Sequence, residues 1–212
     1  MKKYFTEFIG TFFLVLTVVM TVNNPGIAPM APLAIAAMYL AMIYAGGHIS
    51  GGYYNPAVTL AVLIRGKIDR GDALYYILAQ LIASVIAAAI GVYLHDCGGG
   101  LNIVERVNEL PMCIVLGEFL GTFALAYVVL NVTTTSANAG NSHYGLAIGF
   151  TVLSASYALG GLTGAAFNPA IVLGASMAGM FAWDDFLVYL IGILLGAAAA
   201  ATAFQVTYGK EE

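Results

Sequence analysis

The strongest constraint on this chain is a series of apolar runs that carry almost no charge. Of 212 residues, 61% are hydrophobic and only 8% are charged, whereas a soluble domain carries roughly 25% charged residues. Six runs approach the roughly 20 residues that a helix needs to cross about 30 Å of hydrocarbon. They lie near Tyr4–Val22, Ala31–Ala45, Ala73–Leu94, Met112–Asn131, Tyr144–Leu159 and Phe186–Val206. The sequence therefore predicts an all-α integral membrane protein with six transmembrane helices.

Two further apolar segments are too short to span a membrane. Pro56–Ile64 and Pro169–Met177 each have nine residues, which makes a helix of roughly 13–14 Å. Such a helix covers about half of the hydrocarbon layer. We therefore expect two re-entrant half-helices beside the six spans.

The composition also excludes several classes of protein. Seven basic side chains are too few for a nucleic-acid-binding protein. Cys97 and Cys113 have neither the spacing of a metal site nor that of a redox pair. We recognise no catalytic triad, metal-ligand cluster or phosphate-binding loop. The sequence therefore predicts neither an enzyme nor a protein with a cofactor or bound metal.

The basic residues predict the orientation of the chain in the membrane. With six spans both termini lie on one side, and cytoplasmic segments carry an excess of Lys and Arg. On the side of the termini lie Lys2, Lys3, Arg65, Lys67, Arg70 and Lys210, and only Arg106 lies opposite. We expect a multi-pass protein of the plasma (inner) membrane, in contact with the lipid bilayer, with both termini in the cytoplasm.

The sequence contains an internal repeat. Glu-Phe-Ile-Gly-Thr-Phe at 7–12 recurs as Glu-Phe-Leu-Gly-Thr-Phe at 118–123, and the stretch 47–57 recurs at 160–170. The single domain, 1–212, thus divides into halves of about 1–105 and 106–212. Each half has three spans, an odd number, so the second half is inverted relative to the first. In inverted repeats the functional site is expected at the midplane, between the halves.

Each half carries the triplet Asn-Pro-Ala at the start of its short segment. Asn is a favoured N-cap, and Pro is favoured at the first helical position. Two such helix starts meeting at the midplane would present unpaired N–H groups and the positive ends of two helix dipoles, to which Asn55 and Asn168 would add side-chain donors. This arrangement favours neutral solutes and opposes cations and protons. The predicted pore centre is Asn55, Pro56, Ala57, Asn168, Pro169 and Ala170.

Gly-rich stretches precede both triplets and predict non-helical backbone at membrane depth. Such backbone is tolerated where it lines a wet cavity, and its carbonyls would accept hydrogen bonds from solutes. The predicted pore-lining carbonyls are those of Gly47, His48, Ile49, Ser50, Gly160, Gly161, Leu162 and Thr163. Glu7 and Glu118 are carboxyls inside spans, and their symmetry favours structural acceptors for loop N–H groups over a proton relay.

These motifs resemble the aquaporin/major intrinsic protein family over nearly the whole chain. The likeness rests on the Gly-His-Ile-Ser-Gly stretch at 47–51, Asn-Pro-Ala-Val-Thr at 55–59, the second Asn-Pro-Ala, the two Glu-Phe-x-Gly-Thr-Phe starts and Ala79-Gln80. It implies six membrane helices plus two re-entrant half-helices, one pore per subunit and usually a homotetramer.

The chain departs from the family pattern at the expected selectivity filter. Most members have Arg after the second Asn-Pro-Ala, and glycerol facilitators add Asp; here these positions hold Ile171 and Val172. Tyr53 replaces a common His. Counted along the family pattern, the filter is Ile35, Ser156, Ala165 and Ile171. Without the charge of an Arg, this filter is wider or more apolar than that of a water-specific channel, and a very apolar constriction can instead dewet and close.

The leading interpretation is a passive channel for water and/or small uncharged solutes, among them glycerol, urea, ammonia, gases and metalloid hydroxides. One alternative is a closed, structural membrane protein of the same fold. Another is a coupled transporter, which would need charged groups along its path.

Overall fold

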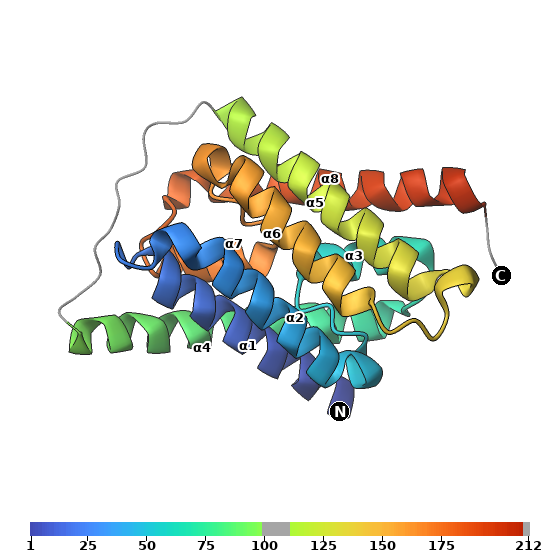
Figure 1. Ribbon diagram of the computed structural model, residues 1–212, viewed down its shortest axis with the longest axis horizontal. Coiled ribbons are helices and arrows are strands. Elements are labelled where there is room, and N and C mark those ends of the chain that lie inside the picture. The colour runs from blue at the N-terminus through green and yellow to red at the C-terminus, as the bar shows by residue number, and fades with distance from the viewer. Residues whose placement is uncertain (99–110, 210–212) are drawn as a thin grey trace.

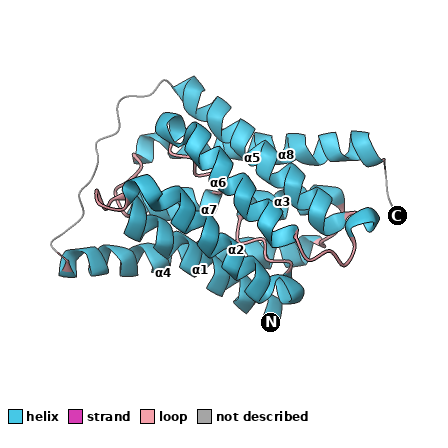
Figure 2. Cartoon of the chain, viewed as in Figure 1, coloured by secondary structure: helices cyan, strands magenta, loops and turns pink. Residues whose placement is uncertain are grey.

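Long helices arranged side by side form most of the molecule. The computed structural model describes residues 1–98 and 111–209, and within them the chain is made of helices and loops (Figures 1 and 2). Six helices have 20 to 28 residues. They are α1 (Lys2–Val22), α2 (Ala31–Ser50), α4 (Arg70–Cys97), α5 (Pro111–Thr134), α6 (Tyr144–Thr163) and α8 (Phe186–Tyr208). All six are long and apolar enough to cross a membrane, so the predicted spans are confirmed.

Two short helices, α3 (Pro56–Arg65) and α7 (Pro169–Met177), have ten and nine residues. Single 3-10 turns at Ala28–Met30, Ser136–Asn138 and Trp183–Asp185 connect α1 to α2, α5 to α6 and α7 to α8. Both short helices begin at the proline of an Asn-Pro-Ala triplet, as predicted. Each preceding Asn is extended and caps its helix: Asn55 accepts from the N–H of Ala57 at 2.8 Å, and Asn168 from the N–H of Ala170 at 2.9 Å.

Equivalent helices of the two halves run in opposite directions, as α1 and α5 show in Figure 1. The same pairs pack in each half, α1 with α2 and α4, and α5 with α6 and α8. The expected boundary near 105/106 lies outside the described residues. Both termini lie on the same side of the bundle (Figure 1), which we call the terminal side.

The two Gly-rich stretches before the triplets are helical, contrary to the sequence prediction. Gly47 to Ser50 form the last turn of α2, and Gly160 to Thr163 form the last turn of α6. Each helix ends one residue later, at Gly51 and Gly164, which have φ of 91° and 88°. Their N–H groups bond to the carbonyls of Gly47 and Gly160 at 2.8 and 2.9 Å. Gly51 and Gly164 take the left-handed conformation that ends a helix, so the true loops are 51–54 and 164–167.

Small residues allow close approach between α5 and α8. A Cβ on Gly192 would lie 2.6 Å from the carbonyl oxygen of Val115, and one on Gly196 would lie 2.5 Å from that of Phe119. No side chain fits there, since real Cβ contacts are not this short. The Gly-x-x-x-Gly pattern thus brings two helix backbones together within the chain.

Candidate functional site

The site is built on two loops that carry unusual backbone conformations. In 51–54 the φ of Tyr54 is 50°, and in 164–167 the φ of Phe167 is 49°. Non-glycine residues rarely adopt such values and do so where the surroundings hold them. Both side chains are buried. The matching values show that the repeat extends to the detailed shape of the loops.

Buried carboxylates hold both loops. Glu7 accepts four hydrogen bonds: from the Ser50 hydroxyl at 2.7 Å, the N–H of Tyr53 at 3.0 Å, the N–H of Tyr54 at 2.6 Å and the Gln80 amide at 2.8 Å. All four partners are donors, so the carboxylate is used entirely as an acceptor.

Glu118 occupies the equivalent place in the second half. It accepts from the Thr163 hydroxyl at 2.7 Å, the N–H of Ala166 at 3.1 Å and the N–H of Phe167 at 2.7 Å. Both glutamates have no solvent exposure. This is the loop-holding geometry that the sequence predicted for the pair.

The two halves join directly through their asparagines. The Asn55 amide donates to the carbonyl of Phe167 at 2.9 Å, and the Asn168 amide donates to the carbonyl of Tyr54 at 2.9 Å. The starts of α3 and α7 therefore meet, although they are more than 110 residues apart in sequence. From there α3 runs to the terminal side, where the Gln205 amide near the end of α8 bonds to the Ile64 carbonyl.

The backbone donors at this centre differ from the expectation, whereas the asparagine side chains keep a donor. The N–H groups in the first turns of α3 and α7, which have no partner within the helix, donate to the Asn side-chain oxygens. They are therefore not available to a solute. Each Asn amide spends one hydrogen on the opposite loop, which leaves its second hydrogen as the donor near the pore. These backbone N–H groups are already paired because the oxygen that accepts from them belongs to the Asn that caps the same helix.

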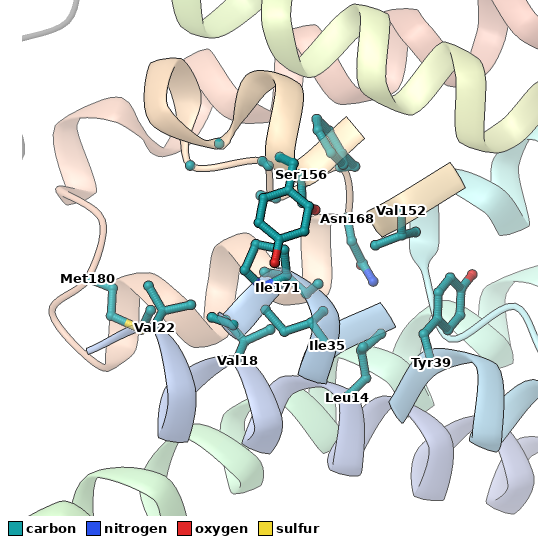
Figure 3. A pocket seen from close by; sticks show the side chains of 18 of the residues that line it. Leu14, Val18, Val22, Ile35, Tyr39, Val152, Ser156, Asn168, Ile171 and Met180 are labelled. Atoms are coloured by element: carbon teal, nitrogen blue, oxygen red, sulfur yellow. The ribbon is translucent and has the colours of Figure 1, made fainter. Parts of the chain in front are cut away.

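A cavity of about 410 Å³ begins at this centre. It contains both asparagines and all four residues that the sequence assigned to the filter: Ile35, Ser156, Ala165 and Ile171. Figure 3 shows Met180 and Val22 at one end, Tyr39 at the other, and the labelled filter residues between them. Val22 ends α1, so the cavity lies on the side opposite the termini.

The cavity wall is mostly apolar and has no charged residue. Its other members include Leu14, Val18, Leu125, Val152 and Phe181, and no lining residue is charged. Ser156 adds a hydroxyl, whereas the Tyr39 hydroxyl is already bonded to the carbonyl of Tyr53 at 2.9 Å. A solute in this cavity meets few hydrogen-bonding groups and no fixed charge.

Of the eight residues whose carbonyls the sequence predicts to line the pore, two line the cavity and six do not. Gly160 and Gly161 line the cavity even though they are helical. Leu162, Thr163 and the four residues Gly47, His48, Ile49 and Ser50 are not among its lining. The hydroxyls of Ser50 and Thr163 point to the glutamates instead.

Sequence reasoning missed several buried polar groups that fix the loops. The Tyr76 hydroxyl donates to the Ser50 carbonyl at 2.8 Å, and the Tyr189 hydroxyl donates to the Thr163 carbonyl at 2.5 Å. The Ser84 hydroxyl donates to the Ala170 carbonyl at 2.5 Å. Tyr76 and Tyr189 are 113 residues apart, the same offset as the triplets, so the repeat itself contained the signal for this pair.

Six apolar helices, two half-helices that meet at their N-termini and an uncharged cavity at the meeting point define a membrane channel. Comparison with known proteins agrees. The model of the family described as Major intrinsic protein matches residues 1–204. The chain is 37% identical over 219 aligned positions to Glycerol uptake facilitator protein-like 6 of Lactiplantibacillus plantarum, with both chains covered completely.

One further relative and one solved structure extend this likeness. Probable aquaporin PIP1-5 of Arabidopsis thaliana is 34% identical, with 94% of this chain and 76% of that protein covered. The fold matches that of the aquaglyceroporin from Plasmodium falciparum with a TM-score of 0.81 and 20% identity, over 96% of this chain and 94% of that one. The chain belongs to the major intrinsic protein family. It is a passive channel for water and small solutes and not an enzyme.

Proposed function

We propose that this channel admits uncharged solutes larger than water, with glycerol as the reference size, and that Ile35, Ser156, Ala165 and Ile171 form its narrow region. The supporting observation is that all four line one cavity, which reaches both asparagines and has no charged residue in its wall. Ile171 stands where an Arg is usual in the family, so the wall lacks a long side chain with five donors. The relative named as a glycerol uptake facilitator-like protein supports the same substrate size.

The observed contacts support the two alternative functions less well. A coupled transporter needs charged or ion-binding groups on the path, but Glu7 and Glu118 are occupied by loop donors and do not line the cavity. A closed structural protein is favoured only if the apolar wall excludes water altogether. Flux measured with and without ion gradients separates these functions, since a channel gives no uphill accumulation.

We further propose a homotetramer in the plasma membrane with cytoplasmic termini. The family resemblance supports the tetramer, and the basic residues on the terminal side support the orientation. Size-exclusion chromatography with light scattering in detergent measures the number of subunits.

The decisive experiment replaces Ile171 by Arg. Purified wild type and Ile171→Arg are placed in vesicles at equal protein content, and stopped-flow light scattering measures water and glycerol permeability. Arg adds bulk, five donors and a permanent charge, so we expect glycerol permeability to fall by on the order of tenfold or more, and water permeability to fall less. A wild type that excludes glycerol contradicts the proposal. Equal glycerol permeability in both proteins shows that Ile171 does not line the constriction.

A further inference from the structure

The repeat relates the wall of the cavity to a second wall on the terminal side. Residues of the second half correspond to residues 113 positions earlier, as Asn168 does to Asn55. Gly160, Ala165 and Ala166 line the cavity on the side opposite the termini. Their partners are Gly47, Gly52 and Tyr53. Because the halves are inverted, the repeat predicts these partners at the wall of the passage on the terminal side.

One pair of corresponding residues differs greatly in side-chain size. Ala166 presents a methyl group to the cavity, whereas Tyr53 presents a phenol ring at the equivalent place in the other half. An aromatic side chain is among the largest that a protein wall can carry. The cavity reaches Asn55, Asn168 and Tyr39 in this direction, and Tyr53 is not among its lining. The ring therefore belongs to the part of the passage beyond the asparagines.

The backbone of Tyr53 is held on both sides. Its N–H donates to Glu7 at 3.0 Å, and its carbonyl accepts from the Tyr39 hydroxyl at 2.9 Å. Tyr39 is also a lining residue of the cavity. The backbone of Tyr53 thus connects the loop scaffold with the wall of the opposite half of the passage.

The ring of Tyr53 is also confined. Its centroid lies 5.6 Å from that of Tyr76, and a Cβ on Gly51 would come within 2.7 Å of its Cε1 atom. Tyr53 nevertheless stays partly exposed, whereas Gly52, Tyr54 and Asn55 around it are buried. Irregular backbone at membrane depth is tolerated where it is buried in protein or lines a water-filled cavity, so the partial exposure of Tyr53 fits a place in the wall of the passage.

We propose that Tyr53 forms a second selectivity site on the terminal side, which sets the upper size limit for the uncharged solutes that the apolar filter admits. This proposal rests on the proposed function, because a limit of this kind acts only on solutes that pass Ile171. Its phenol also offers one donor and acceptor on a side where the predicted carbonyls of Gly47 to Ser50 belong to a helix.

The test measures the size limit directly. Wild type, Tyr53→Ala and Tyr53→Phe are compared in vesicles of equal protein content, with urea, glycerol, erythritol and ribitol as solutes in stopped-flow light scattering. The matched control is Tyr93→Ala, since Tyr93 on α4 is 68% exposed. We expect Tyr53→Ala to raise the permeability to erythritol and ribitol by on the order of tenfold relative to glycerol. Tyr53→Phe and Tyr93→Ala should keep the wild-type limit.

A second variant covers the case in which Tyr53→Ala does not fold. Tyr53→His keeps a smaller ring against Tyr76, and we expect it to shift the limit in the same direction by a smaller step. An unchanged ratio of erythritol to glycerol permeability in folded Tyr53→Ala or Tyr53→His overturns the second site. The filter assignment of Ile35, Ser156, Ala165 and Ile171 still holds in that case if Ile171→Arg lowers glycerol permeability. A shifted ratio together with an ineffective Ile171→Arg supports Tyr53 and refutes the filter assignment.

Discussion

At the scale of single residues, the pore depends on side chains that bind backbone rather than solute. Glu7 and Glu118 each collect donors from one loop, and Asn55 and Asn168 each cap one half-helix and reach across to the other loop. The loops need such partners because their N–H groups would otherwise be unpaired at membrane depth, where each costs several kcal/mol. The residues with the strongest sequence signal thus act mainly as scaffold.

The first residue-scale prediction concerns Glu7→Gln. Gln has nearly the same shape but only one acceptor oxygen, and its NH₂ group would face donors that now bond to the second carboxylate oxygen. We expect a loss of about 1–3 kcal/mol in the free energy of unfolding. It appears as a lower melting temperature in detergent and as reduced water permeability in vesicles.

Thr11→Val is the matched control on the same helix. The Thr11 hydroxyl is buried and has no hydrogen-bond partner in the described part of the chain, so its replacement by an isosteric methyl should leave the melting temperature unchanged or raise it. Equal effects of Glu7→Gln and Thr11→Val would refute the scaffold role of the carboxylate.

At the scale of elements, close helix contacts fix where the half-helices can sit. The α5–α8 pair approaches through Gly192 and Gly196, whose missing side chains face carbonyls of the partner helix. The Tyr189 hydroxyl, on the same helix, then reaches the carbonyl of Thr163 at the end of α6. The spacing of two long helices is therefore linked to the loop that precedes α7.

We predict that Gly192→Ala destabilises the fold. The new methyl would lie 2.6 Å from the Val115 carbonyl, so the helices must separate at a cost of about 1–3 kcal/mol. Gly161→Ala is the matched control, because a Cβ there meets nothing within 4 Å and Ala is the better helix former. The measurement is thermal unfolding in detergent, and equal melting temperatures for the two variants would contradict the close contact.

At the scale of the whole molecule, lipid replaces water as the surrounding solvent. Large apolar side chains such as Phe5, Leu187 and Val206 are 65%, 68% and 82% exposed on membrane-spanning helices, which is untenable in water. The inverted repeat places both termini on one side (Figure 1). The end of α4 and the start of α5 consequently lie on the other side of the membrane.

The native thiols test this orientation. Cys97 ends α4 and Cys113 lies at the start of α5, and both are exposed. In intact cells a membrane-impermeant maleimide should label these exposed thiols, and the double variant Cys97→Ser/Cys113→Ser should remove that signal. A single cysteine placed by Lys2→Cys in a protein without Cys97 and Cys113 should react only after the membrane is permeabilised. Labelling of the Lys2→Cys variant in intact cells would invert the proposed orientation.

Much of the architecture follows from local sequence. The six spans, the two short segments and the helix starts at Pro56 and Pro169 depend on hydropathy, length and the Asn-Pro capping pattern, all of which act over a few residues. The repeat also pairs Glu7 with Glu118 within the sequence itself. These features were predictable because their physical causes lie within one segment of chain.

Only the tertiary structure decided where α2 and α6 end and what the polar groups bind. Several glycines can stop each helix, and the stop falls at Gly51 and Gly164 because the following N–H groups reach a glutamate more than 40 residues away. The asparagine amides likewise find carbonyls 112 and 114 residues distant. Hydrogen bonds between segments so far apart depend on how the two halves pack, and no local pattern contains that information.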